Sequence, residues 1–436
     1  MKRFLLFVAM IISGLGLFAQ NIGDNISIDY VRYVLKFTVT STEPAECEVI
    51  CESKASSAAI VAKIPSTVTI GEKEFNVTSI GEDAFYGKNF SGVEFPDGLV
   101  SIGKNAFNYC GSLVSVEIPN TVVTIGDYAF HNCKSLESIT FEENSHLTSI
   151  GDSALGRSYS NIIPLYESIE IPSSVTHIGK YVFQSCTNLK NVTFEDNSQL
   201  VSIGDNAFSA CENLSLIDFG ENSQLDSIGQ QAFYMSGLRC IEIPASVTYI
   251  GKNVFINSGL RSIVCHAVTP PDANNAFSNS SLSDIYVPAE SVELYNNEYP
   301  WNIYKINDIS NSSVIVGMYS TIDYGEYSLD FIITDVENAK CGVVCSKHPE
   351  VMTTITIPSS ATIDGIDYSV TSVEYKAFYD CENVIGIEMP NTITTIYGYA
   401  FGDCYNLKSL SIYLYILLYL FLIKKHHLLC TCTLLH

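Results

Sequence analysis

The sequence predicts an α/β repeat fold, a solenoid of short strands and short helical turns with β-rich N-terminal modules. Three observations predict it: a six-residue phrase that recurs along the chain, an alternating apolar and polar step after each copy, and a second copy of the whole arrangement. The 436 residues are 47% hydrophobic and 16% charged, so the chain can bury a large core and is not disordered.

The recurring phrase is Ile-Gly-x-x-Ala-Phe, and its copies lie about 22 to 28 residues apart. This interval is in the range of leucine-rich repeats, so the predicted architecture is a leucine-rich-repeat solenoid. The aromatic position of the phrase, expected to fill the core, is occupied in turn by Phe85, Phe107, Phe130, Leu155, Phe183, Phe208, Phe233 and Phe255.

The unit is clearest between Ile102 and Thr124. Ala106, Cys110 and Leu113 have the spacing of one face of a short helical turn. Val116 and Ile118 then alternate around Glu117 as in a half-buried strand, which the next residue, a proline, ends. One unit cannot bury this apolar stripe alone, so the units are expected to stack around a continuous core.

The phrase IGxxAFxxCxxLxxIxIPxxVxx resembles the BspA-like leucine-rich repeats of bacterial and some protist surface proteins. The resemblance covers roughly residues 80–308 and 373–411, and residues 269–308 resemble the terminal segment of such arrays. It implies a non-enzymatic surface protein that adheres to host matrix proteins and to other cells.

The whole arrangement of leading segment and repeats occurs twice in the chain. YVLKFTV at Tyr33–Val39 matches YSLDFII at Tyr327–Ile333, 294 residues later, and a Cys-x-x-x-Cys pair follows each segment. The expected organisation is a signal peptide at 1–19, a β-rich leading module at 20–79, a repeat array at 80–268, its terminal cap at 269–308, a linker at 309–320, a second β-rich leading module at 321–372, an incomplete second array at 373–411 and an apolar tail at 412–436.

Both ends of the chain differ from the repeats. Lys2 and Arg3 followed by an apolar run to Leu17 have the pattern of a signal peptide, which predicts a secreted or cell-surface protein. The apolar run near the C-terminus is shorter than the roughly 20 residues that span a bilayer. We interpret residues 412–436 as a frameshifted or truncated gene end, and the alternative is a short membrane-associated tail.

The 14 cysteines do not predict seven disulfides. Ser236 and Ser258 occupy the same repeat slot as several cysteines, which favours small buried core fillers; these cysteines are Cys110, Cys133, Cys186, Cys211, Cys381 and Cys404. The pairs Cys47/Cys51 and Cys341/Cys345 are harder to assign. On a strand the two thiols of a pair lie about 13 Å apart, whereas a hairpin would allow them to bond. No His or further Cys at ligand spacing supports a zinc site.

Motifs for catalysis and for nucleotide binding are absent from the sequence, so no enzyme, cofactor or metal site is predicted. The 47 Asp and Glu against 23 Lys and Arg give a formal net charge of −24. This balance argues against nucleic acid as a partner, because phosphates are bound by clustered basic residues.

The exposed side of the stacked strands is the candidate ligand-binding face. Its expected residues, one from each repeat, are Glu94, Glu117, Thr140, Glu170, Thr193, Asp218 and Glu242. Carboxylates stacked at about 4.8 Å repel one another unless solvent, cations or a partner relieves them. We expect this face to bind a basic or extended protein, either host matrix or another cell-surface protein. The alternatives are a face kept acidic for solubility, a self-associating scaffold, and a glycan-binding protein.

Overall fold

The computed structural model describes residues 21–30, 33–52, 60–157, 166–311, 319–335, 338–349, 351–363, 365–374, 377–379, 381–398, 400–413 and 431–435. Two compact units divide the chain: Met1–Asn188 with Ser198–Leu200, and Leu189–Asn197 with Val201–His436. Their boundary falls inside the first predicted array, so the domain boundaries drawn from the sequence stay predictions. The predicted signal peptide and residues 414–430 of the tail lie outside the described residues.

The first unit opens with a β-rich module. Its strands are β1 (Asn25–Asp29), β2 (Val34–Thr42), β3 (Ala45–Cys51), β4 (Val61–Lys63), β5 (Thr67–Ile70) and β6 (Lys73–Ile80). β1, β2 and β3 are antiparallel neighbours, and β6 pairs with β3 in parallel and with β5 in antiparallel fashion. Leu35 and Phe37 on β2 are fully buried while the residues between them are not, as the alternation of a half-buried strand requires.

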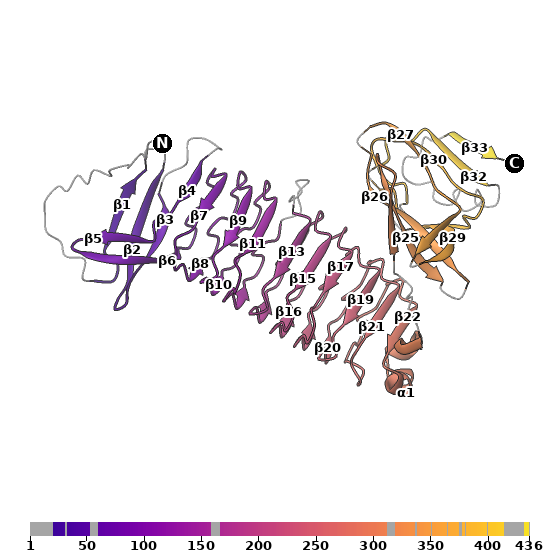
Figure 1. Ribbon diagram of the computed structural model, residues 1–436, viewed down its shortest axis with the longest axis horizontal. Helices are drawn as coiled ribbons and strands as arrows, with labels where there is room; N and C mark the ends of the chain where they lie inside the picture. The colour runs from indigo at the N-terminus through magenta and orange to yellow at the C-terminus, as the bar shows by residue number, and fades with distance from the viewer. Residues whose placement is uncertain are drawn as a thin grey trace. The chain divides into compact units, whose positions relative to one another are not determined.

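Each following coil contributes a longer strand and a two-residue strand, and Figure 1 shows them as two separate rows. The longer strands of the first unit are β7 (Gly92–Glu94), β9 (Ser115–Ile118), β11 (Ser138–Phe141) and β13 (Ser168–Ile171). The short ones are β8 (Ser101–Ile102), β10 (Thr124–Ile125), β12 (Ser149–Ile150) and β14 (His177–Ile178). The short strands pair in parallel, Ile with Ile, from one coil to the next.

The glycine of each Ile-Gly phrase stands where neighbouring coils approach closely. A Cβ on Gly103 would lie 2.7 Å from the carbonyl oxygen of Ile80, and one on Gly126 would lie 2.7 Å from the amide nitrogen of Lys104. Neither glycine has a positive φ. The lack of a side chain, rather than backbone freedom, is therefore what the repeat requires at this position.

The segment predicted as a short helical turn is instead a run of tight turns. The N–H of Ala106 donates to the Gly103 carbonyl within its coil (3.2 Å), whereas the N–H of Phe107 donates to the Ala129 carbonyl of the next coil (2.7 Å). Asn105 has a φ of 55°, in the left-handed region. Because alternate N–H groups bond to the neighbouring coil, no α-helix forms here, and the prediction is wrong in this detail.

The repeat phenylalanines stack through the core. In the first unit the ring of Phe107 lies 4.9 Å from that of Phe85 and 5.2 Å from that of Phe130, both nearly parallel. The corresponding rings of the second unit, Phe208 and Phe233, are 5.4 Å apart. All seven repeat phenylalanines of the first array are buried: Phe85, Phe107, Phe130, Phe183, Phe208, Phe233 and Phe255.

The repeat cysteines lie beside this stack. The thiol of Cys110 donates to the Phe85 carbonyl of the preceding coil at 2.9 Å, and that of Cys133 donates to the Phe107 carbonyl at 3.2 Å. Four of them are buried in the first array: Cys110, Cys133, Cys186 and Cys211. Burial raises the pKa of the Cys110 thiol to about 12, which keeps the donating proton in place.

No disulfide joins any two of the twelve cysteines between Cys47 and Cys404. Cys47 and Cys51 are buried on the single strand β3, and Cys341 and Cys345 are buried on the single strand β26 (Lys340–Lys347). Neither pair spans a hairpin, so the hairpin alternative for closing these pairs is wrong.

The second unit contains further coils, which end in a cap. Its longer strands are β15 (Asn191–Phe194), β17 (Leu216–Asp218), β19 (Cys240–Ile243), β21 (Ser262–Cys265), β22 (Asp284–Val287) and β23 (Lys305–Asp308), and its short strands are β16 (Ser202–Ile203), β18 (Ser227–Ile228) and β20 (Tyr249–Ile250). In the cap, α1 (Val292–Asn297) carries the buried Tyr295, which packs edge-on against Trp301. Trp301 also packs edge-on against Phe277, at the end of the ring stack, and its indole N–H donates to the Pro271 carbonyl at 2.9 Å.

The same unit holds the second β-rich module, built from β24 (Tyr319–Asp323), β25 (Ser328–Asp335), β26, β27 (Thr353–Thr356), β28 (Ser360–Ile363) and β29 (Ile366–Val373). The strand order β24-β25-β26-β29 with β28 on β29 repeats the order β1-β2-β3-β6 with β5 on β6. The coil strands β30 (Val384–Glu388), β31 (Thr395–Ile396) and β32 (Ser409–Tyr413) follow, and β33 (Thr431–Leu435) pairs with β32 in parallel. Within the described residues, the structure contains no helix with the length and apolar character needed to cross a bilayer.

Candidate binding face

The ladder face is the row of middle residues on the outer side of the longer strands. Glu94, Glu117, Thr140 and Glu170 are exposed in the first unit, while Val116 and Ile118 on either side of Glu117 are buried. In the second unit Asp218 and Glu242 are exposed and Thr193 is half-buried. The row becomes apolar at the next two strands, where Val264 and Tyr286 occupy the same position and are buried.

Acidic residues are not direct neighbours in the paired strands of this face. Glu117 lies beside Thr140, Thr193 beside Asp218, and Glu242 beside Val264. Glu94 lies beside Lys63 of β4, and the two form an ion pair of 2.8 Å. The expectation of stacked, mutually repelling carboxylates is therefore wrong for these pairs, because a neutral or basic residue separates the charges.

At two places on the face, two consecutive coils both carry an acidic residue. At each of these places the sheet is broken, because the two strands belong to different sheets. Glu94 and Glu117 lie on β7 and β9, which belong to different sheets. Asp218 and Glu242 lie on β17 and β19, which also belong to different sheets. Like charges directly opposite in a sheet destabilise it, and at these two places continuous pairing would bring two carboxylates together. A third break, between β11 and β13, separates Thr140 from Glu170 and has no such pair.

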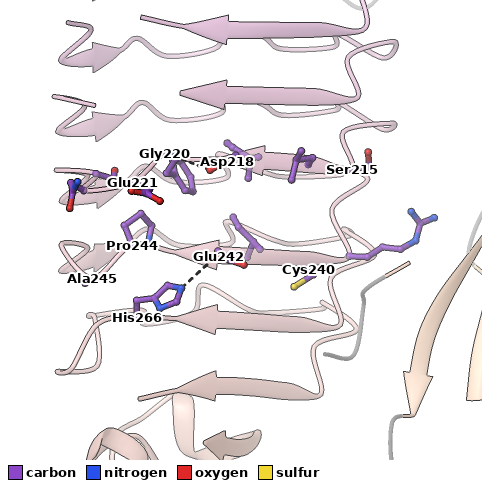
Figure 2. A pocket seen from close by; sticks show the side chains of 16 residues that line it. Ser215, Asp218, Gly220, Glu221, Cys240, Glu242, Pro244, Ala245 and His266 are labelled. Atoms are coloured by element: carbon purple, nitrogen blue, oxygen red, sulfur yellow. Dashed lines mark hydrogen bonds and ion pairs between the residues drawn. The ribbon is translucent and has the colours of Figure 1, made fainter. Parts of the chain in front are cut away.

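The break between β17 and β19 holds a groove of about 760 Å³. Figure 2 shows Asp218 and Glu242 on successive strands of this groove, with Pro244 and Ala245 beyond the end of β19. Leu216, 45% exposed, adds an apolar surface to the same groove. The groove thus combines carboxylates with apolar side chains along the direction of the strands.

The turn after β17 is fixed by a glycine and two carboxylates. Gly220 has a φ of +70°, and a Cβ there would lie 2.7 Å from the carbonyl oxygens of Phe194 and Glu195 in the preceding coil. Its N–H donates to Asp218 Oδ1 at 3.0 Å, and the N–H of Glu221 donates to an Asp196 carboxylate oxygen at 2.9 Å. Asp196 and Asp218 thus satisfy backbone groups of the turn, while the Glu221 side chain stays exposed at the groove.

One wall of the groove carries a charged contact that spans two coils. His266 Nε2 lies 3.4 Å from Glu242 Oε2, and Figure 2 marks this contact. The hydrogen bond from His266 lowers the pKa of the Glu242 carboxyl, so its charge persists to lower pH. Arg239 lies at the other end of the lining. No sequence motif singles out His266 or Arg239, because their place in the groove depends on the register of neighbouring coils.

A comparison with models of protein families identifies the family of these repeats. The model of the BspA type leucine rich repeat region matches six copies, at residues 66–166, 157–283, 227–322 and 351–421. The chain belongs to the BspA-type leucine-rich repeat family. The predicted family and the predicted repeat fold are both confirmed. No curated protein matches the chain.

Solved structures similar to this BspA-type chain include leucine-rich repeat proteins of several bacteria. A leucine-rich repeat protein from Bacteroides ovatus is 21% identical over 92% of this chain and 98% of its own, with a TM-score of 0.40. A leucine rich cell surface protein from Faecalibacterium prausnitzii is 20% identical over 89% of each chain, with a TM-score of 0.36. The pneumococcal vaccine antigen PcpA is 20% identical over 62% of this chain and 89% of its own, with a TM-score of 0.28.

BspA-type proteins are in general non-enzymatic repeat proteins that act by binding other proteins, and they are typically found at the cell surface or secreted. This family membership accounts for the conspicuous regularity of the core and leaves the exposed positions to carry specificity, since only the core residues are needed for stacking.

Proposed function

We propose that this BspA-type chain is a secreted or cell-surface, adhesin-like protein whose ladder face binds a basic, extended segment of a host matrix or cell-surface protein. The groove between β17 and β19 supports this proposal most directly. Its exposed Asp218, Glu221 and Glu242 face solvent together, beside the exposed Leu216. Basic side chains of a ligand would meet these carboxylates, and its apolar side chains would cover Leu216.

The charge of the whole chain favours the same class of partner. A formal net charge of −24 creates a negative potential that attracts basic proteins and speeds their encounter. An extended segment also fits the shape of the groove, because its lining follows successive residues of two strands. The alternating acids of the first unit, Glu117 and Glu170, extend the acidic character of the ladder face there.

Charge reversal in the groove tests the proposal. The double variant Glu221→Lys/Glu242→Lys changes two exposed side chains, and the matched control Glu290→Lys/Glu293→Lys changes the net charge equally on the exposed surface of the cap. Binding to a panel of purified extracellular-matrix proteins and to a lysine-rich peptide would be measured by biolayer interferometry at several salt concentrations. We expect the groove variant to bind at least about tenfold more weakly than the control. Equal affinities for the two variants would contradict the proposal.

Glycan binding is a second candidate, favoured by exposed tyrosines on the turns. Tyr86 and Tyr109 are 47% and 50% exposed, and their rings are 5.7 Å apart in an edge-to-face pair. Exposed aromatic rings can stack on the apolar faces of sugars. A glycan array would show binding that Tyr86→Ala/Tyr109→Ala removes and Glu221→Lys/Glu242→Lys preserves; the absence of any glycan signal would exclude this function for the arrayed sugars.

A further inference from the structure

A cluster of cysteine and histidine side chains lies in the second copy of the duplicated design. One ligand atom from each of Cys345, His348 and Cys381 lies within 4.8 Å of the other two. The thiol of Cys404, in the next coil, interacts with that of Cys381 and donates to the Phe378 carbonyl at 2.7 Å, so it would turn from this carbonyl to act as a fourth ligand. His348 is only three residues from Cys345 in the sequence, whereas Cys381 and Cys404 come from the next two coils, so the full set is brought together only by the fold.

Backbone contacts fix the positions of these residues. The N–H of Cys345, at the end of β26, donates to the Ala377 carbonyl at 2.8 Å and brings this strand to the turn before Cys381. The Asn383 side chain donates to the Pro349 carbonyl at 3.0 Å, which holds the residue next to His348 against the same coil. The cluster is therefore organised by β26 and the first coil of the second array.

The side chains match the ligand preferences of zinc. Three thiolates and one imidazole form a common structural zinc set, with Zn–S distances of about 2.3 Å and ligand atoms about 3.8 Å apart in a tetrahedron. The three ligand atoms within 4.8 Å need to move by only about an ångström to reach that spacing. Cys345 and Cys381 are buried and His348 is exposed, so an ion would enter from the side of the imidazole.

The first copy provides an internal contrast. Cys51 and Cys110 stand at the positions of Cys345 and Cys404, but Lys54 and Lys88 stand at those of His348 and Cys381. In sequence the first copy therefore has lysines in place of two of the four ligands, and Lys54 lies outside the described residues. The thiol of Cys133, a repeat cysteine of the first array, donates to a backbone carbonyl, and among the described residues Cys345, His348 and Cys381 are the one set of three such side chains close enough to share an ion.

We propose that Cys345, His348, Cys381 and Cys404 form a structural zinc site that joins the second leading module to the first coils of the second array. Binding of the ion releases the thiol protons to solvent and leaves zinc in the divalent state, so no oxidant or reductant takes part.

The test uses the full chain, purified with a thiol-free reductant, loaded with zinc and desalted before metal analysis by mass spectrometry. We expect about one zinc per chain, and tetrahedral thiolate absorption bands when Co²⁺ replaces zinc. Cys381→Ser and His348→Ala should each lower the retained zinc at least about tenfold. The matched control Cys110→Ser, at the position equivalent to Cys404, should retain it.

Because His348 is exposed, His348→Ala should leave the fold intact. Circular dichroism of each variant would check this. A wild-type chain that retains no zinc would overturn the proposal. Single variants Cys381→Ser and His348→Ala that both retain as much zinc as the wild type would overturn it too. A disulfide between Cys345 and Cys381 that persists in the reductant, shown by the mass of the intact chain, would also overturn it.

Discussion

The two leading modules of the chain have the same backbone design and differ in the side chains at one junction. In the first copy the N–H of Cys51 donates to the Ala84 carbonyl at 2.8 Å, and in the second the N–H of Cys345 donates to the Ala377 carbonyl at the same distance. The thiols of Cys110 and Cys404 both donate to the phenylalanine carbonyl of the preceding coil.

Between these conserved contacts the first copy has Lys88 and the second has Cys381. This difference indicates that the repeat backbone determines where side chains lie, while the residue type at a few positions determines the chemistry of the junction. The same separation holds on the ladder face, where buried neighbours such as Val116 and Ile118 are constrained and the exposed residue between them is not.

The largest effect on the free energy of unfolding is expected from removing a ring of the phenylalanine stack in either copy. Phe107 lies between two rings, whereas Phe401 stacks on Phe378 alone, at 5.7 Å, among the described residues. Removing either ring leaves a cavity, so Phe107→Ala should lower the free energy of unfolding by about 3–5 kcal/mol and Phe401→Ala by less. Urea unfolding followed by circular dichroism measures both, and a larger loss for Phe401→Ala would contradict this view of the two stacks.

A smaller effect is expected from the repeat cysteines. Ser236 and Ser258 show that the slot accepts a hydroxyl, and the Ser258 hydroxyl donates to a backbone carbonyl at 2.6 Å. Cys110→Ser should therefore lower the free energy of unfolding by less than about 1 kcal/mol. Thermal unfolding in the presence of a reductant would measure this change; a loss of several kcal/mol would show that the thiol packs in a way that serine cannot reproduce.

The smallest effect on stability is expected from the ion pair between Lys63 and Glu94 at the start of the ladder face. Lys63 forms an exposed ion pair with Glu94, whereas in the second copy the Thr356 hydroxyl donates to Glu388 at 3.0 Å. Lys63→Thr makes the first copy resemble the second and should destabilise the chain by at most about 0.5 kcal/mol at low salt. The difference should vanish at high salt because ions screen the pair. A difference that is independent of salt in urea unfolding would argue for a packing role of Lys63.

Much of the fold is predictable because it follows from local patterns that repeat in register. The buried Phe107, the alternation around Glu117 and the strand end before Pro119 all depend on residues close in sequence. The conformation of the turns was not predictable from apolar spacing, because the left-handed Asn105 and the bonds to the next coil leave the same residues buried as a helix would.

The site features missed by sequence reasoning depend on contacts between coils. The sheet break at Asp218 and Glu242 and the approach of Cys381 to Cys345 are set by how coils stack. A signal did exist for the second: Cys381 and Cys404 occupy the same slot of successive units, and stacking places such slots side by side. His348, three residues after Cys345, would have completed the set.

The most direct test of the contrast between the copies is to transfer the ligands. Lys54→His and Lys88→Cys together give the first copy the same four residue types as the second; Lys54 lies outside the described residues, and the Cys51 N–H bonds to Ala84 as that of Cys345 does to Ala377. If residue type alone decides the chemistry of this junction, zinc retained by the full chain should rise from about one to about two per chain. A grafted chain that retains no more zinc than the wild type would contradict this account.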